Sequence, residues 1–131
     1  NVTCMADPAD WRNHHNDLWH WFKHAQPFIA GKALIPPEML GIGSPEGYLS
    51  VAREICRKAV AGETGTSLRV RQRHALDVLV TEYLVWYEPP GARHGIFLVV
   101  KDCGSYGELQ TMFPPTEGRN YFDEQEGDLL Q

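Results

Sequence analysis

Apolar residues recur at helical spacing in the first part of the chain. Asp7-Pro8 is a good helix start, because aspartate caps free N–H groups and proline is tolerated in the first turn. The apolar residues that follow on one helical face are Trp11, Leu18, Phe22 and Ala25. Pro27 ends this pattern, and residues 28–43 are rich in glycine and proline, which predicts a loop or short turns.

A second helix is predicted from Ser44-Pro45-Glu46 to the glycine-rich residues 62–65. Its apolar stripe consists of Tyr48, Ala52, Ile55 and Ala59. We expect a third helix to begin near Leu68, capped by Thr66 or Ser67, and to carry the arginines of "RVRQRHAL", residues 69–76.

The following residues favour strands. β-Branched and aromatic side chains dominate residues 76–87, so the third helix is expected to give way to a strand between Val78 and Tyr83. Residues 96–102 and 108–113 are two further short runs with turn-forming neighbours, which predicts a three-strand antiparallel meander. Pro114-Pro115 ends the sheet, and the acidic residues 123–130 are expected to be frayed or bound to the surface.

This order of elements predicts an α+β fold, with N-terminal helices packed on a small C-terminal antiparallel sheet of three to four strands. We expect residues 1–131 to form one domain, with a helical part over residues 1–65 and a helix plus sheet over residues 66–131. Four Trp, five Tyr and five Phe favour a packed core. The sequence contains no apolar run of bilayer-spanning length and no recognisable signal peptide, so no membrane partner is expected.

The charge limits the classes of partner. A net charge of −5 argues against indiscriminate nucleic-acid binding, which depends on many contacts of Lys and Arg with phosphate. A small site for one or two phosphates stays open. Cys4, Cys56 and Cys103 are an odd and widely spaced set, so a disulfide framework is not expected, and no CxxC pair indicates zinc.

Arg71, Arg73 and His74 form the first candidate site. A histidine with an ordinary pKa accepts and returns a proton near neutral pH, and guanidinium groups bind phosphate oxygens in bidentate fashion. Metal-free cleavage of RNA needs both functions. The alternative is a basic, solvated start of a helix.

Thr111 and Phe113 form the second candidate site, because alternate residues of a strand share one face. The hydroxyl would hydrogen-bond a phosphate while the ring stacks on a base. The alternative is a threonine on the wet face of the sheet and a phenylalanine at its edge.

The elements "RQRHA" (71–75), "GELQTMF" (107–113) with Pro114, and "GRNYF" (118–122) together resemble a colicin D-type nuclease domain. These domains are one branch of the barnase, EndoU, colicin E5/D and RelE-like ribonuclease fold. The resemblance covers residues 69–125, and the order of the elements agrees. Two features depart from the family pattern: its lysines are arginines here, and its tryptophan is Phe113.

The resemblance implies a metal-independent endoribonuclease, without a cofactor, that cleaves tRNA by attack of the 2′-OH and leaves a 2′,3′-cyclic phosphate. It implies that His74 is the general acid or base, that Arg71 and Arg73 bind the scissile phosphate and that Thr111 hydrogen-bonds it. Substrate contacts are expected from Phe113, Tyr121, Arg93 and Lys101. The implied biology is a toxin module that acts in the cytoplasm, is delivered as the C-terminal part of a secreted toxin and is neutralised by an immunity protein.

Two other function classes fit the residues. The acidic balance and the aromatic, charged segment "WHWFKH" (19–24) are also typical of a non-enzymatic protein-binding domain, such as an immunity or adaptor protein. Asp17, His20 and His24 share one helical face at positions i, i+3 and i+7, which is a partial metal site and suggests a small metalloprotein.

Overall fold

The computed structural model describes residues 10–11, 45–88, 95–103 and 107–130. In chain order the elements are β1 (Asp10–Trp11), α4 (Pro45–Ala61), β2 (Thr66–Ala75), β3 (Val78–Tyr87), β4 (Ile96–Asp102), β5 (Gly107–Phe113), α5 (Arg119–Asp123) and β6 (Asp128–Leu129).

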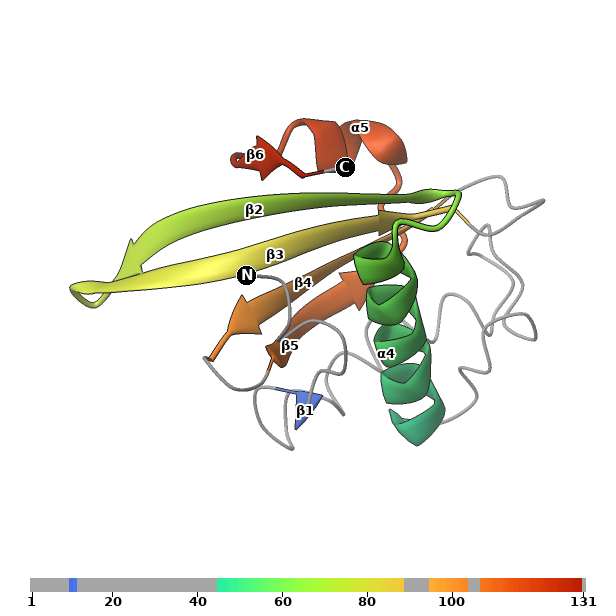
Figure 1. Ribbon diagram of the computed structural model, residues 1–131, viewed down its shortest axis with the longest axis horizontal. Coiled ribbons are helices and arrows are strands. Elements are labelled where there is room, and N and C mark those ends of the chain that lie inside the picture. The colour runs from blue at the N-terminus through green and yellow to red at the C-terminus, as the bar shows by residue number, and fades with distance from the viewer. Residues whose placement is uncertain (1–9, 12–44, 89–94, 104–106, 131) are drawn as a thin grey trace.

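The strands form one sheet in the order β1-β5-β4-β3-β2-β6. The neighbouring strands from β5 to β6 run antiparallel, and β1 pairs with β5 in parallel. The α+β fold class and the meander of β3, β4 and β5 therefore agree with the sequence-based expectation. Figure 1 shows α4 and α5 at one end of the sheet, whereas the β2–β3 hairpin projects from the other end.

Helix α4 agrees with its predicted bounds and apolar stripe. The stripe residues Tyr48, Ala52, Ile55 and Ala59 are all buried against the sheet. The hydroxyl of Tyr48 donates a hydrogen bond to the carbonyl oxygen of Met112, which ties the start of α4 to β5. Burial raises the pKa of this phenol above its ordinary value, so the hydroxyl keeps the proton that it donates.

The expectation of a third helix is wrong, because residues 66–75 form strand β2. The side chains of Leu68 and Val70 face the core under α4, whereas the arginines at 69, 71 and 73 lie on the opposite face. This is the two-residue alternation of a strand. Pairing with β3 along ten registered positions outweighs the good helix propensity of arginine, glutamine, alanine and leucine.

The alternation gives the sheet two different faces. On the α4 face, alternate residues of the central strands build the larger core, which includes Leu68, Val85, Leu98 and Leu109. On the α5 face a smaller cluster contains Leu84, Trp86, Phe97, Val99 and Phe122. Side chains on one face therefore do not reach the other.

The expectation for the start of the chain is wrong, whereas the acidic tail, which was expected to be frayed or bound to the surface, is bound. Asp10–Trp11 are a strand, not part of a helix, because they pair with Glu108 and Leu109 of β5. The other residues of that expected helix, and the loop over residues 28–43, lie outside the part that the structure describes. In the acidic tail, Asp128–Leu129 pair with β2 and are not frayed. Among the helices of the described residues, none has the length and apolar character that a membrane crossing requires.

Candidate binding site on the β2–β3 arm

The β2–β3 hairpin extends beyond its neighbours in the sheet. Strand β6 pairs only with Arg69 and Val70 of β2, and β4 pairs with β3 only from Glu82 onward. Residues 71–81 thus form a two-stranded projection, which we call the arm (Figure 1).

The turn at the tip of the arm is unusual in composition. Leu76 and Asp77 connect the strands, and both have positive φ angles, 51° and 65°. Two-residue hairpin turns with this backbone normally carry Asn-Gly or a similar pair, because glycine and the short polar side chains of Asn and Asp tolerate positive φ, whereas other side chains are strained there. A leucine in this conformation costs about 1–2 kcal/mol.

The tip is apolar and exposed. The exposed fractions of Leu76, Val78 and Leu79 are 98%, 60% and 54%. Leu76 lies in the turn, and strand alternation places Val78 and Leu79 on opposite faces of the arm, so a partner that covers all three side chains must enclose the tip.

The arginines at the base of the arm have a structural partner. Glu82 is 2% exposed, and its carboxylate accepts hydrogen bonds from Arg71 Nε at 2.9 Å and from Arg73 Nε and Nη2 at 3.0 and 3.2 Å. Arg71 Nη1 also donates to the Gln125 side chain at 3.3 Å. A buried carboxylate requires this compensation, so both guanidinium groups are engaged in the fold.

His74 lies apart from the other predicted catalytic residues. It is exposed and pairs with Leu79, and strand alternation places it on the face opposite to Arg73. Thr111 belongs to the cross-strand row that runs through Val99 and Leu84 to Arg69. With about 3.3 Å per residue and about 4.8 Å between strands, the Cα atoms of His74 and Thr111 lie about 20 Å apart. The two residues do not converge on a common phosphate.

Four of the polar residues that were predicted from the sequence as site residues share the α5 face of the sheet. Arg71, Arg73 and Lys101 lie in or beside the row of Glu82, and half-buried Thr111 lies on the neighbouring strand. Lys101 pairs in register with Glu82 on one side and with Glu108 on the other. Acidic groups therefore accompany the cations of this face.

Phe113 and Tyr121 hold α5 against the sheet. Their rings are 5.3 Å apart, and each packs edge to face with Phe97, at 5.7 and 4.9 Å between centroids. Phe122, on the same helix, is fully buried between Arg69 and Arg119. This aromatic cluster explains the "GRNYF" element as packing.

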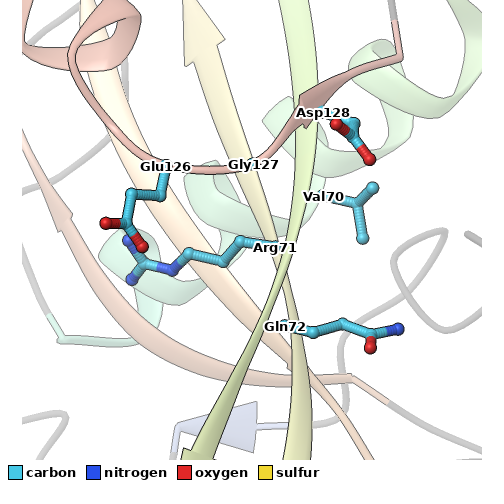
Figure 2. A pocket seen from close by; sticks show the side chains of 6 residues that line it. All are labelled: Val70, Arg71, Gln72, Glu126, Gly127 and Asp128. Carbon is cyan, nitrogen blue, oxygen red and sulfur yellow. The ribbon is translucent and has the colours of Figure 1, made fainter.

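A cavity of about 320 Å³ lies beside β2, where β6 begins. Its lining residues are Val70, Arg71, Gln72, Glu126, Gly127 and Asp128 (Figure 2). Arg71 is engaged with Glu82 and Gln125, so the remaining charge in the lining of the cavity comes from the carboxylates of Glu126 and Asp128. A phosphate has no favourable place here.

The remaining candidate residues lie outside the described ranges. They are Arg93 and the proposed metal ligands Asp17, His20 and His24. Within residues 10–11, 45–88, 95–103 and 107–130, no group of three or more His, Cys, Asp or Glu side chains is arranged to hold a metal ion.

The arm was not predicted from the sequence. The signal was present in "RVRQRHAL", because arginines at alternate positions next to Leu68 and Val70 have the period of a strand. Leu76-Asp77 is not one of the dipeptides that mark a two-residue hairpin, and Asp77 by itself is a weak turn signal.

Comparisons of the chain with protein-family models, with curated proteins and with solved structures find no match. The assignment of function therefore depends on the geometry of this chain.

Proposed function

We propose that the chain is a non-enzymatic protein-binding domain, of the kind that immunity or adaptor proteins represent, and that the arm is its binding element. The observation that carries the proposal is the exposure of Leu76, Val78 and Leu79 on a projection. Burial of these three side chains by a partner would contribute several kcal/mol, at about 25 cal/mol per Å² of apolar surface.

The strained turn supports the same function. A leucine that is 98% exposed stabilises nothing in the folded chain, yet it occupies a conformation that disfavours it. Such strain is typical of functional positions, where the side chain serves a purpose other than folding. The side chain of Arg73 is 54% exposed although it pairs with Glu82, so it offers a partner a polar contact beside the tip.

Site-specific photo-crosslinking tests this function. We would replace Leu76 with benzoylphenylalanine in the cells that produce the protein, and place the same residue at exposed Ser50 on α4 as the matched control. We expect a discrete adduct from position 76 that position 50 does not give and that the double variant Val78→Thr, Leu79→Thr abolishes. Identical adducts from both positions, or none from position 76, would contradict the proposal.

A tRNA endoribonuclease neutralised by an immunity protein is a second candidate. The observation in its favour is that Arg71, Arg73, Lys101 and Thr111 share the α5 face. Because His74 lies on the other face, this activity requires a different general base.

The test is incubation of the purified protein with total tRNA in EDTA. Fragments with cyclic phosphate ends that Arg73→Ala, Lys101→Ala prevents and His74→Ala leaves unchanged would favour cleavage. Intact RNA would exclude it.

A further inference from the structure

The arm lacks neighbours on both sides. Within the part of the chain that the structure describes, the outer side of β2 has no strand partner beyond Val70, and β3 has none before Glu82. A two-stranded ribbon is marginally stable by itself in water, whereas a third strand makes such a structure stable. The arm is therefore expected to gain order when another strand adds to one of its edges.

Charge distinguishes the two edges. The β2 side of the arm carries Arg73, which is 54% exposed, and charged side chains are a common protection of edges against unwanted pairing. The β3 side carries Val78, Leu79 and Val80 without a charge. Strand β4 pairs Lys101 with Glu82 and ends one residue later, at Asp102. Within the described residues, the segment of β3 that is open on this side is therefore 78–80. This edge is the one suited to accept a strand.

We propose that a second copy of this chain pairs antiparallel with residues 78–80, so that two arms join into a four-stranded ribbon with two-fold symmetry. The inference rests on the proposed function, because the same arm does the binding. With the axis at Leu79, this side chain faces Leu79 of the partner subunit, and Val78 faces Val80 of the partner subunit. An interface of this type is self-complementary and closes as a dimer.

A second copy fits this edge because its self-pairing brings no like charges together. The same symmetry applied to β2 with the axis at Arg73 would place this arginine opposite its own copy, which is destabilising in a sheet. The new contacts cover parts of Val78 and Leu79, which are 60% and 54% exposed in the single chain. Three residues per strand bury far less than the roughly 800 Å² per subunit of a stable interface, so the dimer is expected to be weak and concentration-dependent.

Cysteine pairing tests the register of this dimer. In an antiparallel pair, directly opposite residues have Cβ atoms about 4.5–5.5 Å apart. Leu79→Cys should therefore form a disulfide-linked dimer under mild oxidation, whereas Val78→Cys, the adjacent and similarly exposed position, should not. The unmodified chain controls for the native cysteines, of which Cys56 is buried and Cys103 half-buried. Equal cross-linking of both variants, or none, would overturn the inference.

Sedimentation tests the dimer without a new cysteine. The weight-average mass should rise above that of one chain with increasing concentration, and Leu79→Lys should return it to one chain because two ammonium groups would face each other. Gln72→Lys adds the same charge to exposed β2 and should leave the association unchanged. If the protein is a monomer at all concentrations but still gives the adduct from position 76, the dimer is overturned and the proposed protein partner is not. If the protein forms the dimer but gives no adduct with another protein, the proposed protein partner is overturned and the dimer is not.

Discussion

Glu82 determines what the arginines of the arm do. A carboxylate that is 2% exposed loses most of its hydration, and the loss is offset only by donors with good geometry. Arg71 lies directly opposite it in the register, and Arg73 reaches it from two residues further along β2. The alternate spacing of the two arginines in "RQR", residues 71–73, thus serves one buried acid.

Replacement of Glu82 by glutamine should destabilise the protein. The amide keeps the volume and one acceptor but removes the charge that holds two guanidinium groups, of which that of Arg71 is three-quarters buried. We expect a loss of about 1–3 kcal/mol in the free energy of unfolding, measured by urea denaturation. Arg73→Gln is the control. Because its side chain is 54% exposed, the loss should be smaller, and equal losses would contradict this account.

Replacement of Leu76-Asp77 by Asn-Gly should stabilise the fold while it weakens binding. Both residues have positive φ angles, and Asn-Gly suits this turn without strain. The free energy of unfolding should rise by about 1 kcal/mol, since the leucine makes no packing contribution that is lost. Denaturation measures the first effect, and the yield of cross-linking from a probe at position 79 measures the second. A loss of stability would show that Leu76 is a packing residue.

At the scale of elements, the composition of β2 and the period of its side chains favour different structures. Its composition favours a helix, whereas its period of two favours a strand, and β3 decides the outcome by offering a full-length partner. Helix α4 and strands β3 to β5 could be predicted because their apolar spacing, caps and flanking turns agree with one another.

Two strands could not be predicted from the sequence. Strands β1 and β6 have two residues each, and their pairing comes from distant segments of the chain. The site residues could not be grouped correctly from the sequence either, because the face of the sheet on which each residue lies depends on its being in a strand. Adjacent residues such as Arg73 and His74 were grouped as one constellation, but in a strand neighbours in sequence face opposite sides.

Gly127→Ala should detach β6 from the sheet. Gly127 has φ 123°, and a Cβ there would collide with the carbonyl oxygen of Val70. The cost is limited by local release of the tail, so hydrogen exchange should accelerate in residues 128–130 while the global stability changes little. Gly118→Ala is the control, because Gly118 has φ 63° but open space around it. Unchanged exchange of the tail in Gly127→Ala would contradict the prediction.

At the scale of the molecule, folding and binding use different residues. Both core clusters lie between the helices and the sheet, and neither contains a residue from 71 to 79. The chain as a whole carries −5, whereas residues 71–79 contain two arginines, one histidine and a single aspartate. Glu82 pairs with both of these arginines, so the arm offers a partner mainly the apolar side chains at its tip, which favours an end-on approach.

Shortening the arm should therefore separate binding from folding. Residues 74–79 would be replaced by Asn-Gly, so that Arg73 and Val80, which are already paired, close the hairpin. Removal of two residues per strand keeps the alternation of the hydrogen-bonding pattern, and the contacts of Arg71 and Arg73 with Glu82 remain.

We expect the free energy of unfolding to stay within about 1 kcal/mol of the parent, since the removed side chains are exposed or half-buried. Adducts from a photo-crosslinking residue at exposed position 72, as well as the concentration-dependent mass, should disappear. A shortened protein that fails to fold would show that the tip belongs to the core, and one that keeps its adducts would place the binding surface elsewhere.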